Sequence, residues 1–192
     1  MKKRLQGRAW IFGDHIDTDA ITPGKYENLP LKELCRHCLE PVNGAFAQNV
    51  KKDDVVVAGE NFGCGSTREI APGALKELKV GAVVAKSFAR TFFRNAIAIG
   101  LPLLVSQDAA QECRQGDILA IDIPHSRIRN MTTKKPIPAE PIPEELYYIL
   151  SNGGLFSAHK KKRQGKTHVS ASLAFGQKGR SSMKVRRPRG RL

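Results

Sequence analysis

The chain has 192 residues, 41% of them hydrophobic, which is enough for one domain with a substantial core. No apolar run approaches the roughly 20 residues of a membrane-spanning helix, and no signal-peptide pattern follows the basic N-terminus, so we expect a cytoplasmic protein without membrane contact. The net charge of +14 is uneven, because residues 160–192 hold 12 Lys and Arg and no acid, against 20 basic and 18 acidic side chains before them. Nucleic-acid binding needs positive charge on the folded surface, so we do not expect it of the folded part.

Apolar periodicity and turn residues predict alternating strands and helices. In chain order these are a strand at 8–12, a polar loop at 14–19, a helix at 29–39, a strand at 55–58, a glycine-rich turn followed by a helix, a strand at 82–85, a helix at 92–99, a strand at 103–105, a helix at 109–114, a strand at 118–123 and a helix at 144–151. The β-branched runs at 55–58 and 82–85 are typical of strands buried on both faces. The pattern predicts a single α/β domain at 1–163 and a basic, disordered tail at 164–192.

Two groups of residues could suggest a metal, and we expect neither to bind one. Cys35 and Cys38 form a C-x-x-C pair without a second pair of ligands, so two ordinary helical residues are the better interpretation. The acids of the 14–19 loop lack the glycine and the distal glutamate of a calcium-binding hand.

The turn at 59–69 links a buried strand to a helix, the position where α/β proteins gather ligands. Gly63 and Gly65 would allow positive φ or close approach to a ligand. Ser66 and Glu69 fit a capping box, which is the simpler interpretation of Ser66. Arg68 nevertheless adds a group that can hold a carboxylate with two hydrogen bonds, beside a hydroxyl among N–H donors that can stabilise an alkoxide.

Three stretches of sequence carry a family resemblance. They are Asn61–Glu69 (NFGCGSTRE), Gly13–Ile21 (GDHIDTDAI) and Lys86–Asn95 (KSFARTFFRN). In their order along the chain, beginning with 13–21, they resemble the motifs of the small subunits of 3-isopropylmalate dehydratase, in the aconitase superfamily. The resemblance covers about residues 7–158 and implies a swivelling β/β/α three-layer domain of the aconitase C-terminal type.

The resemblance also implies an activity and a set of roles. Members of this family work with a large subunit that carries a [4Fe–4S] cluster, whose open iron acts as a Lewis acid on the leaving hydroxyl of a small hydroxy-dicarboxylate. This chain itself would bind no cofactor. Ser66 matches the catalytic base, and Thr67 and Arg68 match residues that bind substrate carboxylate. The resemblance also implies that Asp17, Thr18 and Asp19 bind substrate. The implied reaction is isomerisation of 2-isopropylmalate to 3-isopropylmalate in leucine biosynthesis.

A departure from the family pattern concerns the specificity loop, residues 24–28, in which Tyr26, Glu27 and Asn28 stand where many members have Tyr-Leu-Arg. Glu27 would repel a third substrate carboxylate. This argues for a dicarboxylate with an alkyl group as the substrate and against homoaconitate. A 2,3-dimethylmalate dehydratase or homoaconitase subunit stays open, as does a basic-tailed nucleic-acid-binding protein on the same fold. Arg90 and Arg94 could equally be ion-pair partners or face an anion.

Overall fold

The computed structural model describes residues 3–163. Seven strands form one sheet in the order β4-β3-β2-β1-β5-β6-β7. Four of them are parallel neighbours, namely β1 (Arg4–Ile11), β2 (Val55–Ala58), β3 (Ala82–Ala85) and β4 (Leu103–Val105). The other three continue the sheet in antiparallel pairs, namely β5 (Ile118–Asp122), β6 (Arg127–Asn130) and β7 (Pro136–Ile137).

The two faces of the parallel strands pack into two separate cores. On β2, Val56 and Ala58 lie in one core and Val55 and Val57 in the other, and β3 alternates in the same way. Both strands are buried along their whole length, as continuous apolar runs predict. The parallel strands therefore form the middle layer of a three-layer β/β/α domain.

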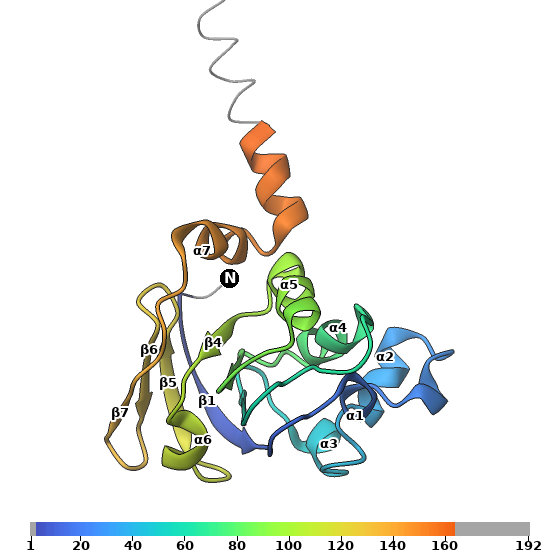
Figure 1. Cartoon of the computed structure of the whole chain (residues 1–192), viewed down its shortest axis with the longest axis horizontal. Coiled ribbons are helices and arrows are strands. Elements are labelled where there is room, and N and C mark those ends of the chain that lie inside the picture. Colours follow the sequence, from blue (N-terminus) through green and yellow to red (C-terminus); the bar gives the residue numbers. More distant parts are fainter. Residues whose placement is uncertain (1–2, 164–192) are drawn as a thin grey trace, which may run out of the picture. The chain divides into compact units, whose positions relative to one another are not determined.

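Helices cover one face of the middle layer (Figure 1). They are α1 (Thr18–Ile21), α2 (Leu31–Leu34), α3 (Phe46–Asn49), α4 (Ile70–Glu77) and α5 (Arg90–Ile99). Helix α6 (Ala109–Glu112) packs on the opposite face with β5–β7. The helix expected at 29–39 is shorter than predicted, because α2 passes into a 3₁₀ turn, η2 (Cys35–His37), and Leu39 then takes a positive φ. The sequence did not predict α1, which begins inside the expected 14–19 loop, or α3, β6 and β7.

The first compact unit of the chain comprises Met1–Ala158. Helix α7 (Glu144–Ser151) begins and ends as expected, and Gly153 and Gly154 follow it with positive φ. No helix among residues 3–163 is long and apolar enough to cross a membrane. The expected domain boundary after residue 163 stays a prediction, and the tail expected at 164–192 lies outside the described residues.

Candidate active site

Three loops meet where parallel strands β1, β2 and β3 end. A bridge joins Asp17, in the loop after β1, to Cys64, in the loop after β2. A second bridge joins Phe62 to Phe88, in the loop after β3. Backbone hydrogen bonds from Thr18 N to the Cys64 carbonyl, at 2.8 Å, and from Gly63 N to the Ile16 carbonyl, at 2.7 Å, strengthen the junction. The three family-like motifs, which lie far apart in the sequence, thus meet at one junction.

The conformation of the 59–69 turn depends on its glycines. Gly63 and Gly65 have φ of +79° and +91°, a region that other residues rarely adopt. A Cβ on Gly63 would lie 2.2 Å from the ring of Phe92. Gly63 is therefore required for packing against α5.

The capping box expected at Ser66 and Glu69 is absent. Helix α4 begins at Ile70, Glu69 occupies the N-cap position, and no side chain caps the helix. Pro72 explains the shift, because a proline is tolerated only in the first turn, where its missing N–H has no helical partner. Ser66 is thus an exposed loop residue with its hydroxyl free of a capping role.

Ser66 is held by Thr18. The Ser66 backbone N–H donates to Thr18 Oγ1 at 3.1 Å, and the two hydroxyl oxygens lie 3.1 Å apart. Thr18 is only 1% exposed, whereas Ser66 is exposed. The buried Thr18 hydroxyl thus orients a serine whose side chain is exposed.

Asp17 has a local structural contact. Its carboxylate accepts a hydrogen bond from Ala20 N at 2.6 Å and caps α1. The short helix begins with Thr18, so this cap also fixes the residue that orients Ser66.

Arg68 contacts two carboxylates of its own chain. Its Nη1 donates to Asp19 Oδ1 at 2.6 Å, and its Nη2 lies 3.7 Å from Glu27 Oε2. The second distance is that of an ion pair but is too long for a hydrogen bond. The N–H groups of Nη2 therefore lie near the Glu27 carboxylate without donating a hydrogen bond to it. Sequence reasoning expected Glu27 near the substrate and missed its contact with Arg68.

Other expected site residues lie around this junction. Thr67 and Asn28 are exposed. Arg90 and Arg94 are exposed on α5 and form no ion pair within residues 3–163. Burial and the nearby charge of Asp17 raise the pKa of the Cys64 thiol, so Cys64 is protonated at neutral pH. Among residues 3–163 no group of His, Cys, Asp and Glu is arranged to hold a metal ion.

Taken together, an oriented hydroxyl and a guanidinium lie at the carboxyl ends of the parallel strands of a β/β/α domain. The hydroxyl can exchange a proton, and the guanidinium can hold a carboxylate. The fold and the site thus define an α/β domain suited to a small organic acid.

Comparison with known proteins identifies this domain. The family described as Aconitase C-terminal domain matches residues 16–108. The 3-isopropylmalate dehydratase small subunit of Caldanaerobacter subterraneus is 45% identical over 82% of this chain and 99% of its own length. A methanogen homoaconitase small subunit from Methanothermobacter thermautotrophicus is 44% identical over 84% of this chain and 94% of its own. The crystal structure of a 3-isopropylmalate dehydratase from Methanocaldococcus jannaschii is 42% identical, with a TM-score of 0.81 over 86% of this chain and 98% of that one.

The chain belongs to the family of 3-isopropylmalate dehydratase small subunits, which includes the related homoaconitase subunits. The resemblance stated from three motifs, and the fold class that it implied, are confirmed.

Proposed function

We propose that this chain is the small subunit of a hydro-lyase that isomerises 2-isopropylmalate to 3-isopropylmalate by dehydration and rehydration. The observation that carries the proposal is the exposed Ser66 oriented by buried Thr18, in a chain 45% identical to a protein named for this activity. The family membership supports the reaction class. The geometry of the corner formed by the 14–19 loop and the 59–69 turn supports the roles of its residues.

In this proposal Ser66 moves the proton. As an alkoxide, its Oγ takes the proton from the carbon next to the one that loses hydroxide, and it returns a proton to the resulting alkene diacid during rehydration. A serine hydroxyl is a weak acid, so the charged form must be stabilised. The Thr18 hydroxyl, 3.1 Å away, can donate a hydrogen bond to it.

Arg68 holds a substrate carboxylate. Its Nη2 donors face Glu27 across 3.7 Å and are available for a hydrogen bond, while Asp19 keeps Nη1 in place. Thr67, exposed between Ser66 and Arg68, can donate its hydroxyl to the same carboxylate. Asp17 fixes the start of α1 beneath them.

The leaving hydroxyl is handled by a partner. We propose an iron–sulfur large subunit, because the relatives are named as small subunits and because the family resemblance of this chain implies such a partner. A [4Fe–4S] cluster on that subunit supplies a Lewis acid for the departing hydroxyl when it is bound. The residues of this chain bind the acid, orient it and move the proton.

The experiment is to assemble the chain with the large subunit of its source organism under anaerobic conditions and to measure isomerisation of 2-isopropylmalate. Ser66→Ala should lower kcat by about 10²–10⁴ without loss of assembly. Thr67→Ala serves as a matched control, since it removes the neighbouring hydroxyl and should mainly raise KM. Near-normal turnover by the Ser66→Ala complex would refute the assignment of the base.

The homoaconitase relative makes a tricarboxylate the competing substrate, and 2,3-dimethylmalate is a second alkyl alternative. Steady-state kinetics with 2-isopropylmalate, 2,3-dimethylmalate and the tricarboxylate decide between these substrates. A higher kcat/KM for the tricarboxylate would contradict our choice of 2-isopropylmalate.

A further inference from the structure

A cluster of four side chains anchors the specificity loop from outside the site. The ring of Tyr26 stacks on the ring of His37 with centroids 3.7 Å apart and planes at 18°. The ammonium of Lys25 lies 4.6 Å from the centroid of the Tyr26 ring. The Tyr26 ring thus contacts both an aromatic ring of η2 and the ammonium of the preceding residue.

Glu40 is the common acceptor of this cluster. Its Oε2 lies 2.7 Å from His37 Nδ1, and its Oε1 accepts from Lys25 Nζ at 3.2 Å and from the Tyr26 hydroxyl at 3.3 Å. Hydrogen bonds from His37 and Lys25 hold the pKa of Glu40 below its ordinary value. A single carboxylate therefore joins both anchored residues of the specificity loop to the 3₁₀ turn η2.

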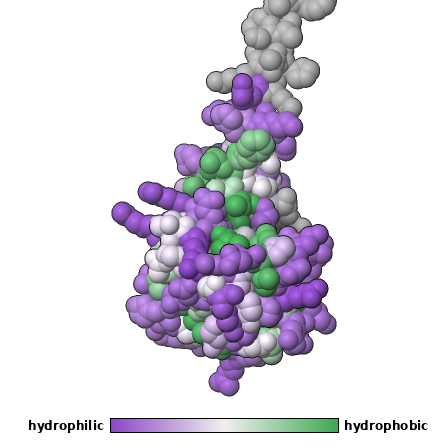
Figure 2. All heavy atoms as spheres, turned by 90° about the vertical axis from the view of Figure 1, so that its right-hand side faces the viewer, coloured by the Kyte–Doolittle hydropathy of each residue, from purple (hydrophilic) through white to green (hydrophobic). Residues whose placement is uncertain are grey.

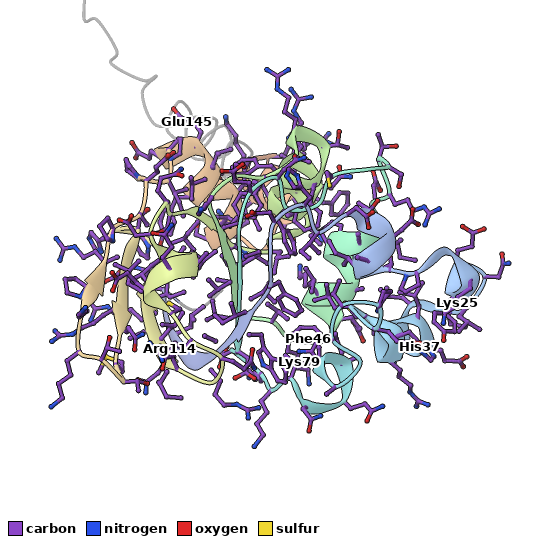
Figure 3. The ribbon with its side chains drawn as sticks, turned by 60° about the horizontal axis from the view of Figure 1, so that its bottom comes forward. Lys25, His37, Phe46, Lys79, Arg114 and Glu145 are labelled. Atoms are coloured by element: carbon purple, nitrogen blue, oxygen red, sulfur yellow. The ribbon has the colours of Figure 1, made fainter. Side chains whose placement is uncertain are left out.

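The segment that carries Glu27, residues 23–29, is closed by its own backbone hydrogen bonds. Tyr26 N donates to the Pro23 carbonyl at 2.9 Å, Glu27 N to the Gly24 carbonyl at 3.1 Å, and Leu29 N to the Tyr26 carbonyl at 3.0 Å. Glu27 follows Tyr26 directly, so the position of its carboxylate depends on the anchored ring. Figure 3 labels Lys25 and His37 on the same side of the molecule, and Figure 2 shows that polar side chains cover most of the face carrying α2.

We propose that Glu40 is a positioning residue for substrate selection. It keeps the specificity loop in the conformation that holds Glu27 beside Arg68. There the Glu27 carboxylate leaves the Nη2 donors of Arg68 open to one substrate carboxylate and repels a further one. Glu40 itself touches no substrate, so the cluster acts only through the loop. This inference rests on the proposed function for the location of the substrate.

The test uses the assembled complex and a matched pair of competitive inhibitors, glutarate and propane-1,2,3-tricarboxylate, which differ by one carboxylate. Glu27→Gln should tighten the tricarboxylate relative to glutarate by about tenfold, because it removes one like charge near the site. Glu40→Ala should shift the ratio of inhibition constants in the same direction, and Glu40→Gln, which keeps an acceptor, by less. Glu33→Ala removes an exposed acid of α2 and should leave the ratio unchanged.

The decisive comparison is the double variant. In the Glu27→Gln background, Glu40→Ala should cause no further change in the ratio, because Glu40 acts only by placing Glu27. Equal shifts with and without Glu27 would overturn the inference, as would an unchanged ratio in Glu40→Ala.

A second measurement does not require turnover. Amide hydrogen exchange at residues 26, 27 and 29 should accelerate in Glu40→Ala and not in Glu33→Ala, since those amides close the loop. Unchanged exchange would refute the anchoring role even if the complex has no activity. An inactive wild-type complex with accelerated exchange in Glu40→Ala would instead refute the proposed function and leave the anchor standing.

Discussion

The contact between Thr18 and Ser66 gives the sharpest test of the site. Thr18→Val replaces a buried hydroxyl with a methyl group of similar size, so the packing around this 1% exposed side chain is kept. The replacement removes the group 3.1 Å from Ser66 Oγ and the acceptor of the Ser66 backbone N–H.

The expected magnitude follows from one hydrogen bond to a charged acceptor. Such a bond contributes about 1.5–3 kcal/mol, and every 1.36 kcal/mol in the barrier is a factor of ten in rate. We therefore expect kcat to fall by about 10–10²-fold. The free energy of unfolding should fall by about 2 kcal/mol, because two neutral hydrogen bonds of the Thr18 hydroxyl are lost from the folded chain.

The assay is steady-state isomerisation by the assembled complex, with thermal unfolding of the free variant measured beside it. Thr18→Ser keeps the hydroxyl and should keep most of kcat, although the lost methyl lowers stability. In the Ser66→Ala background, Thr18→Val should have no further effect on kcat. A Thr18→Val complex that turns over at more than half of the normal rate would refute the role of this contact in proton transfer.

Three further outcomes are expected. Arg68→Lys should raise KM about 10–100-fold with a smaller effect on kcat, because a lysine cannot hold Asp19 and a substrate carboxylate in one plane; unchanged KM in steady-state kinetics would contradict this. Asp54→Asn should lower the free energy of unfolding at pH 7 by about 3 kcal/mol. Urea unfolding followed by the fluorescence of the single tryptophan, Trp10, measures the change. An unchanged unfolding midpoint would contradict this expectation. Truncation after residue 163 should leave kcat and KM unchanged, and salt-sensitive nucleic-acid binding that truncation abolishes would favour the nucleic-acid alternative.

The effect of Asp54 also sets a dependence on pH. Burial raises the pKa of Asp54, but hydrogen bonds from Trp10 Nε1 at 3.0 Å and from the backbone N–H groups of Lys51 and Arg8, both at 2.9 Å, outweigh burial and hold it below the ordinary value. A lowered pKa means that this stabilisation is complete above the unfolded value of about 3.9 and is lost as pH falls through the folded one. The Asn variant should therefore lose less stability than the wild type between pH 5 and pH 3.

Strands and helices with strong local patterns could be predicted from sequence. The segments Val55–Ala58, Ala82–Ala85 and Leu103–Val105 have the predicted bounds because fully buried parallel strands are continuous apolar runs. Strand β6 was missed because Arg127 and Arg129 alternate with Ile128 and Asn130. That short pattern becomes a strand only by pairing with β5 and β7, so tertiary contacts decide it.

The site could be located by its motifs, but its contacts could not. The glycines and Arg68 of the 59–69 turn predict a carboxylate-binding corner, and the structure brings the 14–19 loop to it. The contact of Ser66 with Thr18, 48 positions away, depends on how β1 and β2 pair, and no local pattern encodes it. His37 and Glu40 had no signal beyond the polar face of a short helix, so their link to the specificity loop appears only in three dimensions.

The charges around Arg68 explain why selection and affinity can be separated at this corner. One guanidinium faces two carboxylates, Asp19 at 2.6 Å and Glu27 at 3.7 Å, so the free site has no excess of positive charge with which to attract an acid. In the proposed function a substrate carboxylate binds Arg68 while Glu27 stays close, and the expected repulsion grows with each additional carboxylate. Under the proposed function, part of the affinity for the whole acid is expected to come from a partner that closes over the site, whereas Glu27 is expected to contribute to discrimination by carboxylate number. Removing Glu27 should accordingly strengthen binding of every acid and weaken the distinction among them.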